Sequence, residues 1–405
     1  MTAPGGVRPA YRDPNALRWV VGYLSSLVGD QVWFVALAWA AVQTGTPAQV
    51  GVVLAAGSLP RAVLLLVGGA LTDRWGPRRT ALGSDAVRTV VLVLAAVLAL
   101  TLTPSVSVLV ALAAGFGVVD AMFLPATAAM PQQLVEPEQT VRLQGMRATA
   151  QRAATMLGAP LGGLAVAAGG SSTGFALAAS LTAVGAGALL LTRARPRRPT
   201  VRAPLLGEVR VGLAYTLHHP VLRSLLVLAA VVELGFTGAI NVGLPVLSDH
   251  RGWGAGGVGL MLGAFGVGAT ATAVGLVTLP RVPHVGQWLL PVTLGMALAL
   301  VATGVSPTLP AAVASCAVVG AGAGLAGSLA GSLVLICSSP ELLARVSSLL
   351  LLASLGLSPL ALLAAGGLAA AGGPATPFIA GGAIAALGVP VLLASPALRH
   401  AELPR

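Results

Sequence analysis

The sequence predicts an all-α integral membrane protein with twelve transmembrane helices in two pseudo-symmetric six-helix bundles. Composition is the first reason: 56% of the 405 residues are apolar and 9% are charged, which is too little charge to cover the surface of a soluble protein. The second reason is that apolar runs of about 20 residues or more, enough for a helix to cross a bilayer, recur along the whole chain. The third is that short polar segments separate these runs.

Each apolar run corresponds to one expected membrane-spanning helix. The twelve runs lie near residues 17–42, 48–71, 80–103, 106–130, 144–168, 173–192, 221–247, 255–279, 285–305, 309–337, 345–370 and 376–395. The longest polar connection follows the sixth run and divides the chain. We therefore expect an N-terminal six-helix bundle over residues 1–192, a cytoplasmic linker over 193–220, and a C-terminal six-helix bundle with a short tail over 221–405.

The two halves of the sequence repeat one another. Leu17-Arg18 opens the first run and Leu222-Arg223 opens the seventh, and each of these runs has a carboxylate 10–12 residues further on. The pair Glu138 and Arg142 before the fifth run has its counterpart before the eleventh. Such duplication is typical of transporters that bind substrate between two halves.

The arginines predict the orientation in the membrane. All 23 basic residues are arginine, and with both termini in the cytoplasm all except Arg61, Arg88 and Arg251 fall at the cytoplasmic side. Arginine is enriched in the short cytoplasmic loops of membrane proteins. We therefore expect a multi-pass protein of the plasma (inner) membrane with both termini inside. The same arrangement explains the net charge of +11 without a nucleic-acid partner.

The linker combines a basic segment with an apolar periodicity. Residues 193–199 contain four arginines and two prolines. Apolar residues then recur at helical spacing, from Leu205 to Leu217. This pattern predicts a short amphipathic helix on the inner membrane surface, where anionic lipid attracts arginine. A specific regulatory site in the linker is the alternative.

A charged turn between the second and third runs carries the most specific motif. Residues 69–79 read G-A-L-T-D-R-W-G-P-R-R, a connection so short that it requires a tight hairpin. Gly69 would let another helix approach closely, and Gly76 permits the sharp turn. The segment closely resembles the signature loop between helices 2 and 3 of the major facilitator superfamily, G-x-L-x-D-R-x-G-x-R-R. The matching positions are Gly69, Leu71, Asp73, Arg74, Gly76, Arg78 and Arg79.

This resemblance implies a transporter with the major facilitator fold and a substrate site between its halves at the bilayer midplane. It also implies that Asp73 faces the start of helix eleven, near Arg345, where a negative charge at a helix N-terminus is favourable. Asp85 and Arg88, three residues apart on the third run, can pair on one face. Together with Asp73 and Arg74 they would form a charge cluster that locks the inner gate.

A glycine- and proline-rich segment in the fifth run is similar to the motif that exporters of this superfamily have there. It contains Gly158, Pro160, Gly162 and Gly163, and it differs from the usual spacing by one residue. Phe123–Ala126 and the Glu208–Pro220 linker also resemble the branch that contains macrolide-efflux and enterobactin-exporter proteins. The resemblance covers nearly the whole chain and implies export.

Three carboxylates lie deep in apolar runs: Asp30, Asp120 and Glu233. An unpaired charge is costly in hydrocarbon, so each carboxylate must face a bundle interior or a wet cavity. A low dielectric also favours the protonated form, which makes these groups candidate proton carriers. Asp30 and Glu233 lie near the midplane and are the first candidates for exchanging protons with substrate.

Neighbouring side chains could complete a binding site. Trp33 and Phe34 share the helix face of Asp30 and could form an aromatic cradle for a lipophilic cation. Alternatively, both rings face lipid and Asp30 is a structural hydrogen-bonding group. Asn241 follows Glu233 by two helical turns, and for these two residues a functional and a structural role are equally compatible with the sequence.

Two further polar features lie in the spans. Arg61 in the second run needs a carboxylate partner because it is buried, and we expect Asp120 to pair with it, as a structural ion pair or within the proton pathway. The fifth run has a polar stripe that includes Arg147, Gln151 and Thr155. This stripe either lines an inward-facing cavity or belongs to a helix that protrudes into the cytoplasm.

The sequence contains no hydrolase triad, metal-ligand cluster or nucleotide-binding motif, so we expect neither an enzyme nor direct use of ATP. We expect proton-coupled efflux of a lipophilic drug or secondary metabolite by alternating access, driven by a proton gradient, with no cofactor and a monomeric state. The alternatives are a proton symporter that imports a small polar metabolite, a non-transporting sensor or scaffold, and a membrane enzyme acting on lipid. Cys316 and Cys337 lie too far apart in one run to form a disulfide.

Overall fold

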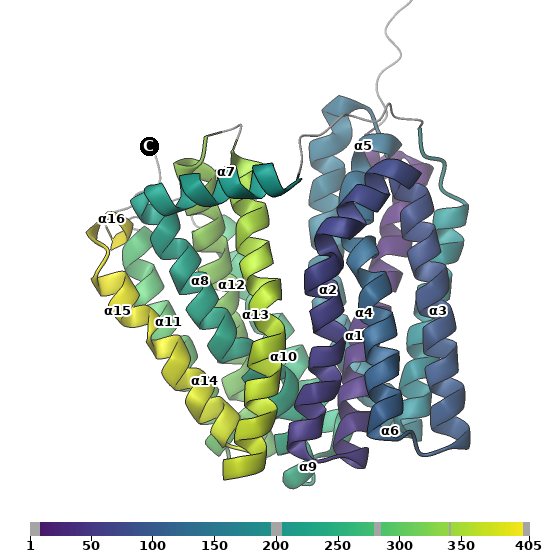
Figure 1. The fold of residues 1–405 in the computed structure, drawn as a ribbon, viewed down its shortest axis with the longest axis vertical. Coiled ribbons are helices and arrows are strands. Elements are labelled where there is room, and N and C mark those ends of the chain that lie inside the picture. Colours follow the sequence, from purple (N-terminus) through teal and green to yellow (C-terminus); the bar gives the residue numbers. More distant parts are fainter. Residues whose placement is uncertain (1–8, 196–204, 279–284, 340–341, 400–405) are drawn as a thin grey trace, which may run out of the picture.

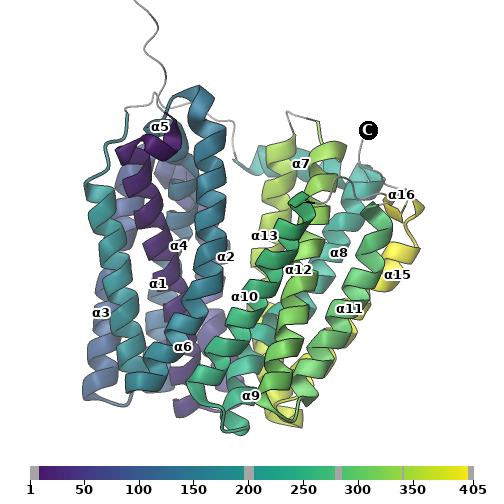
Figure 2. The same cartoon turned by 180° about the vertical axis from the view of Figure 1, so that it is seen from behind.

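Two bundles of helices lie side by side in the computed structural model, which describes residues 9–195, 205–278, 285–339 and 342–399 (Figures 1 and 2). The regular structure of these residues is entirely helical. Helix α7 (Leu205–His218) lies across one end of the C-terminal bundle, and the Tyr215 hydroxyl donates a hydrogen bond to the carbonyl of Cys337 at 3.2 Å. The basic segment 196–204 lies outside the described residues.

Six helices and a short turn make up the N-terminal bundle. They are η1 (Ala10–Arg12), α1 (Pro14–Thr44), α2 (Pro47–Trp75), α3 (Pro77–Thr101), α4 (Val106–Ala129), α5 (Pro131–Leu134) and α6 (Pro137–Leu190). The C-terminal bundle consists of α8 (Pro220–Gly238), η2 (Ala239–Gly243), α9 (Leu244–His250), α10 (Gly254–Thr278), α11 (Val285–Val305), α12 (Leu309–Cys337), α13 (Leu343–Gly372), α14 (Thr376–Ala386), α15 (Gly388–Leu393) and α16 (Pro396–Arg399).

Prolines and caps determine where the helices begin. Proline is the first residue of α1, α2, α3, α6 and α8, a position where its missing N–H removes no helical hydrogen bond. Before α2, the Thr46 hydroxyl accepts from the Gln49 N–H at 3.4 Å, and the Gln49 side chain accepts from the Thr46 N–H at 2.8 Å. This capping box satisfies donors that a helix start otherwise leaves without partners.

Helix α6 contains two membrane spans. Eleven helices of the described residues are long and apolar enough to cross a membrane, and α6 leaves the helical conformation at Gly169 and at Gly170 (φ 75°). Positive φ is open to glycine at no steric cost, and Val166 and Gly174 come into contact across the turn. The prediction of twelve spans is therefore confirmed, although the turn is tighter than the expected gap between residues 168 and 173.

Spans seven and twelve are interrupted instead of continuous. In span seven the α-helical pattern gives way to a five-residue π-helix, η2 (Ala239–Gly243), before α9. Such wide turns inside α-helices frequently occur at functional sites. Span twelve is divided between α14 and α15 at Leu387. The predicted apolar runs 221–247 and 376–395 did not indicate these breaks.

The two bundles meet at the end opposite α7 and lie apart at the end where α7 crosses (Figures 1 and 2). Gly51 of α2 lies against the backbone of Gly366 in α13, and Gly163 of α6 lies against Gly259 in α10. At the same end, the Gln43 side chain donates a hydrogen bond to Asp249 at 2.8 Å. The space between the bundles is therefore closed at one end of the molecule.

The signature turn has the predicted sharp geometry. Gly76 has φ 88° between α2 and α3, and the Arg78 guanidinium donates to the carbonyl of Leu190 at the end of α6 at 2.8 Å. The expectation for Gly69 is wrong, because no atom lies within 4 Å of a Cβ built there. Its neighbour Gly68 makes the close approach instead, to the backbone of α4, since adjacent helical positions point about 100° apart.

Candidate functional site

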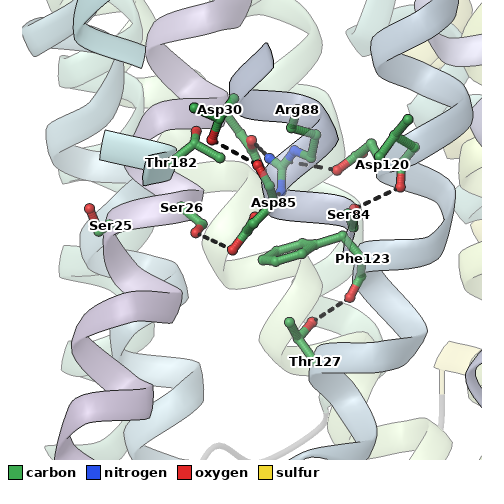
Figure 3. Close-up of polar contacts among 12 residues, drawn as sticks. Ser25, Ser26, Asp30, Ser84, Asp85, Arg88, Asp120, Phe123, Thr127 and Thr182 are labelled. Atoms are coloured by element: carbon green, nitrogen blue, oxygen red, sulfur yellow. Dashed lines mark hydrogen bonds and ion pairs between the residues drawn. The ribbon is translucent and has the colours of Figure 1, made fainter. Parts of the chain in front are cut away.

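Five charged side chains form one network inside the N-terminal bundle, referred to below as the charge network. Its members are Asp30 on α1, Arg61 on α2, Asp85 and Arg88 on α3, and Asp120 on α4. Figure 3 shows the three carboxylates converging on Arg88. Four neighbouring helices thus contribute charges that lie far apart in the sequence.

Arg88 lies at the centre of the charge network and is completely buried. Its guanidinium pairs with Asp30, with Asp85 at 3.1 Å (Nη1 to Oδ1) and with Asp120 at 3.8 Å (Nη2 to Oδ1). The other carboxylate oxygen of Asp120 forms an ion pair with Arg61, with 3.1 Å between Oδ2 and Nε. The Ser26 hydroxyl donates to Asp85 at 2.9 Å. Multiple partners of this kind are what a buried charge requires.

Aromatic rings enclose the guanidinium of Arg88. Its carbon lies 4.5 Å from the ring centre of Phe123 and 5.0 Å from that of Phe116, distances at which a cation is attracted to a ring face. Trp33 stacks on Phe116 at 4.9 Å and contacts Phe175 at 5.2 Å, and only 2% of it is exposed. The expectation that Trp33 faces either a substrate or lipid is wrong, because its ring packs inside the bundle as support for Arg88.

The structure bears on two of the expected ion pairs and on one expected charge cluster. The predicted pairs of Arg61 with Asp120 and of Asp85 with Arg88 are confirmed. The assignment of Asp85 and Arg88 to an inner-gate cluster with Asp73 is wrong: both are buried with Asp30 and Asp120, whereas Asp73 is exposed at the end of α2. Asp85 is two helical turns into α3, where its side chain points into the bundle.

The charge network holds more acid than base. Three carboxylates and two guanidinium groups give a sum of −1 when all five side chains are ionised (−3 + 2). Among the three acids, Asp30 is the most accessible, with 17% of its side chain exposed against 3% for Asp85 and 7% for Asp120. A proton can therefore reach the network most easily at Asp30.

A second feature is a cavity of about 240 Å³ between the two bundles, referred to below as the central cavity. Its lining includes Gln31, Phe34 and Thr155 from the N-terminal bundle, and Phe236, Asn241 and Phe265 from the C-terminal bundle. Phe34 thus lines the cavity, which favours the alternative that its ring belongs to a binding site over the alternative that it faces lipid. The carboxylate of Asp30 is directed to Arg88 instead (Figure 3), and its neighbour Gln31 faces the cavity.

The polar stripe of span five leads to the central cavity. Thr155 lines the cavity, Gln151 is exposed one turn away, and Arg147 lies over the ring of Tyr23, 5.5 Å from its centre. Because these residues share one face of α6, the cavity-lining alternative is favoured over a helix that merely protrudes from the membrane.

Span seven presents a polar ladder with spacing of four residues. The Thr237 hydroxyl donates a short hydrogen bond to Glu233, and Asn241 Nδ2 donates to the Thr237 carbonyl at 2.9 Å. Glu233 is half-buried and is the only charged residue between Arg223 and Asp249. The ladder therefore links the one deep carboxylate of the C-terminal bundle to Asn241 at the central cavity.

The exporter-like segment packs span five against both bundles. A Cβ on Gly158 would lie 2.5 Å from the Gln31 side chain, and one on Gly162 would lie 3.1 Å from Val32, both on α1. Gly163 contacts Gly259 of α10, and Pro160 lies against Gly263 of the same helix. The segment is thus part of the contact that closes one end of the central cavity.

Sequence reasoning did not identify Gln31, Phe236 or Phe265 as cavity residues. Gln31 is an uncharged polar residue in the centre of an apolar run, which is a usable signal. The two phenylalanines could not be identified in this way, because the sequence does not show whether an apolar residue in a membrane span faces lipid, the bundle core or a cavity. Cys316 and Cys337 do not form a disulfide, as expected.

Known proteins resemble the chain along most of its length. The family model of the Major Facilitator Superfamily matches residues 19–356. The multidrug efflux pump Tap of Mycobacterium tuberculosis (strain ATCC 25618 / H37Rv) is 29% identical, over 94% of this chain and 93% of its own. The enterobactin exporter EntS of Escherichia coli O1:K1 / APEC is 27% identical, over 60% of this chain and 58% of its own.

Solved structures share the fold at low sequence identity. A bacterial homolog of the human lysosomal transporter Spinster, in an inward-facing and unoccupied conformation, has a TM-score of 0.68 and 17% identity, and the match covers 96% of both chains. The nucleoside transporter NupG has a TM-score of 0.70 and 13% identity, over 95% of this chain and 99% of its own. These matches confirm the predicted arrangement of two six-helix bundles.

Proposed function

Since the chain belongs to the major facilitator superfamily and is therefore a membrane transporter and not an enzyme, we propose that it exports a small lipophilic molecule from the cell in exchange for protons. The efflux activity named for the relatives Tap and EntS supports the direction of transport. The observation that carries the coupling is the charge network, which is buried, acidic in sum and next to the central cavity.

The orientation supports alternating access. With the arginine-rich end in the cytoplasm, the bundles are open to the inside and closed to the outside, so this structure is the state that takes up substrate from the cell. The opposite state would arise when the outer contacts at Gly51 and Gly163 separate and the inner ends close. The inner gate at Asp73 acts in that second state.

The charge network favours binding of one proton. A net negative charge buried among apolar helices is unstable without compensation, and one proton removes it. When the protein is open to the outside, a proton enters at Asp30 and neutralises the network. When the protein is open to the inside, the proton leaves toward the lower proton concentration of the cytoplasm.

Helix α1 couples the proton to the substrate. Asp30 on this helix belongs to the charge network and the next residue, Gln31, lines the central cavity. A proton at Asp30 weakens its pairing with Arg88, and a substrate at Gln31 contacts the same helical turn. Each ligand thus changes the equilibrium position of α1 for the other, which is the requirement for coupled exchange.

Everted membrane vesicles from cells that express the chain provide the test. Energised vesicles, acidic inside, should accumulate dyes from a panel such as N-phenyl-1-naphthylamine, Hoechst 33342 and ethidium, and adding the transported dye should make the lumen less acidic. An uncoupler should abolish both effects, and vesicles without the chain serve as the control. Dye accumulation that is insensitive to the uncoupler would contradict proton coupling. Movement of dye and protons in the same direction would favour the symporter.

A further inference from the structure

The central cavity has a consistent chemical character. Its lining residues include three phenylalanines, two carboxamides and one hydroxyl group, and none of them is charged. Ligand pockets of this kind are mainly apolar, with a few polar groups that orient the ligand. The lining therefore indicates a chemical class of substrate, which membership of the superfamily does not specify.

Neither Asp30 nor Glu233 lines the central cavity. Asp30 pairs with Arg88 within the N-terminal bundle, and Glu233, which accepts a hydrogen bond from Thr237, lies two helical turns before the cavity residue Asn241. A cation that enters an apolar cavity loses its water, and without a carboxylate partner this loss is not compensated. The cavity thus disfavours a fixed positive charge.

The aromatic rings provide a surface for a flat ring system. Phe236 and Phe265 of the C-terminal bundle lie with ring centres 5.4 Å apart and with planes inclined at 35°, and Phe34 lines the cavity from the N-terminal bundle. Aromatic groups prefer offset-stacked or edge-to-face contacts at such distances. A ring bound here would contact both bundles at once.

Two carboxamide side chains at the cavity have donor or acceptor groups that make no hydrogen bond within the described residues. Gln31 makes no side-chain hydrogen bond within the described residues, and Asn241 Oδ1 accepts none there, although its Nδ2 donates to Thr237. Both side chains are half-buried and line the cavity, so a ligand can reach their free groups. A ligand that can accept from Gln31 and donate to Asn241 would satisfy them.

We propose that the central cavity selects uncharged molecules that contain a planar aromatic ring system and a hydrogen-bonding group. The ring lies between Phe34 on one bundle and the Phe236–Phe265 pair on the other, and the polar group meets Gln31 and Asn241. This proposal rests on the proposed function, because it defines the substrate class of the same transporter. The volume of about 240 Å³ suits the ring system, and larger substituents extend toward the open inner end.

Binding of a matched pair of probes to the purified full-length protein tests the proposal. The probes are acridine, which is uncharged at neutral pH, and 10-methylacridinium, which has the same rings and a permanent positive charge. Equilibrium dialysis against the protein in lipid nanodiscs, with empty nanodiscs subtracted, needs no gradient and no transport. We expect acridine to bind at least about tenfold more tightly than its cation. Equal or tighter binding of 10-methylacridinium would overturn the proposal.

Variants locate the site and provide matched controls. Phe236→Leu should weaken acridine binding by about tenfold, whereas Phe236→Tyr, which keeps the ring, should stay within about threefold of the unmodified protein. Asn241→Asp adds the missing carboxylate and should raise the affinity for 10-methylacridinium. If both Phe236 variants bind acridine normally, the rings do not form the site and the proposal fails.

The two proposals fail in different ways. Loss of proton coupling in vesicles together with normal acridine selectivity would contradict the proposed function and leave the ligand class intact. Proton-driven export of ethidium, together with a lack of acridine preference, would overturn the ligand class and leave the proposed function standing.

Discussion

Gly163 of α6 and Gly259 of α10 touch backbone to backbone where the two bundles meet. A Cβ on Gly163 would lie 2.7 Å from the Cα of Gly259, and the reverse substitution would bring a Cβ within 2.9 Å of Gly163 Cα. Gly51 and Gly366 make the corresponding contact between α2 and α13. The closed end of the central cavity thus depends on two contacts that only glycine allows, because any side chain separates the helices.

Gly259→Ala should therefore shift the protein toward the state that is open at this end. Crowding of about 1–3 kcal/mol changes the ratio of the two states by about fivefold or more. An impermeant thiol reagent applied from outside should label a cysteine at the cavity residue Ala38 (Ala38→Cys) faster in this variant, with Cys316 and Cys337 replaced by alanine. Gly256→Ala is the matched control, since its Cβ would meet its nearest neighbour only at 3.9 Å. Equal labelling of both variants would contradict the role of the contact.

Asp30→Asn should abolish coupling to the proton gradient while the protein still folds. The variant leaves two carboxylates against two guanidinium groups, so the charge network is neutral without a proton. Export against a concentration gradient should cease, and downhill movement of a neutral dye should remain. Asp30→Glu should retain part of the activity with a shifted pH profile. Glu138→Gln, an exposed carboxylate far from the network, is the control; a normal gradient response of Asp30→Asn would make Glu233 the leading proton carrier.

Arg61→Gln should destabilise the N-terminal bundle. It makes the net charge of the network more negative, from −1 to −2, and removing one partner of a fully buried pair costs about 3–5 kcal/mol. Because 29% of the Arg61 side chain is exposed, we expect a smaller loss. The double variant Arg61→Gln/Asp120→Asn restores the net charge of −1 and should recover most of the thermal stability. Additive losses in the double variant would show that the two residues do not act as a pair.

Asp73→Asn should impair export by weakening the inner closure. Its side chain is exposed and the inner ends of the bundles lie apart in this structure (Figure 1), so the closure in which we expect Asp73 to act belongs to the other state. The measurement is the export rate at matched expression, with labelling at Ala38→Cys as a readout of the state. Unchanged export would argue against the gate.

A cysteine at Ser171 should react with an impermeant thiol reagent added outside intact cells. Ser171 follows the Gly169–Gly170 turn at the end of the molecule opposite α7, which we assign to the outside. A cysteine at Pro196, in the linker outside the described residues, should react only after the cells are permeabilised. The opposite pattern would reverse the orientation and, with it, the direction of the proposed transport.

The fold could be predicted because membrane spans and loops differ strongly in composition. The runs of about 20 apolar residues and the signature turn at Gly76 determined the number and pairing of the helices. The breaks in spans seven and twelve could not be predicted, since the π-helix around Asn241 and the break at Leu387 depend on packing between helices. Gly169 and Gly170 indicated a turn, but their hairpin geometry depends on the contact of the two helices.

The candidate site could be predicted only in part. The pairs Arg61–Asp120 and Asp85–Arg88 follow from the rule that a charge in a membrane needs a partner. That rule does not say which way a side chain points, so the sequence placed Asp30 at the substrate and Arg88 at the gate, whereas they pair with each other. The position of Trp33 behind Arg88 depends on rings contributed by α4 and α6, and a single helical pattern does not contain that information.

The one-carboxylate excess of the charge network also determines how the membrane voltage acts on transport. Exchange of one proton for an uncharged molecule moves one positive charge into the cell in each cycle. The transporter is then electrogenic, and a potential that is negative inside contributes about 2.3 kcal/mol per 100 mV to export even without a pH difference. A potassium diffusion potential imposed with valinomycin on vesicles at equal pH should therefore be sufficient to drive dye transport.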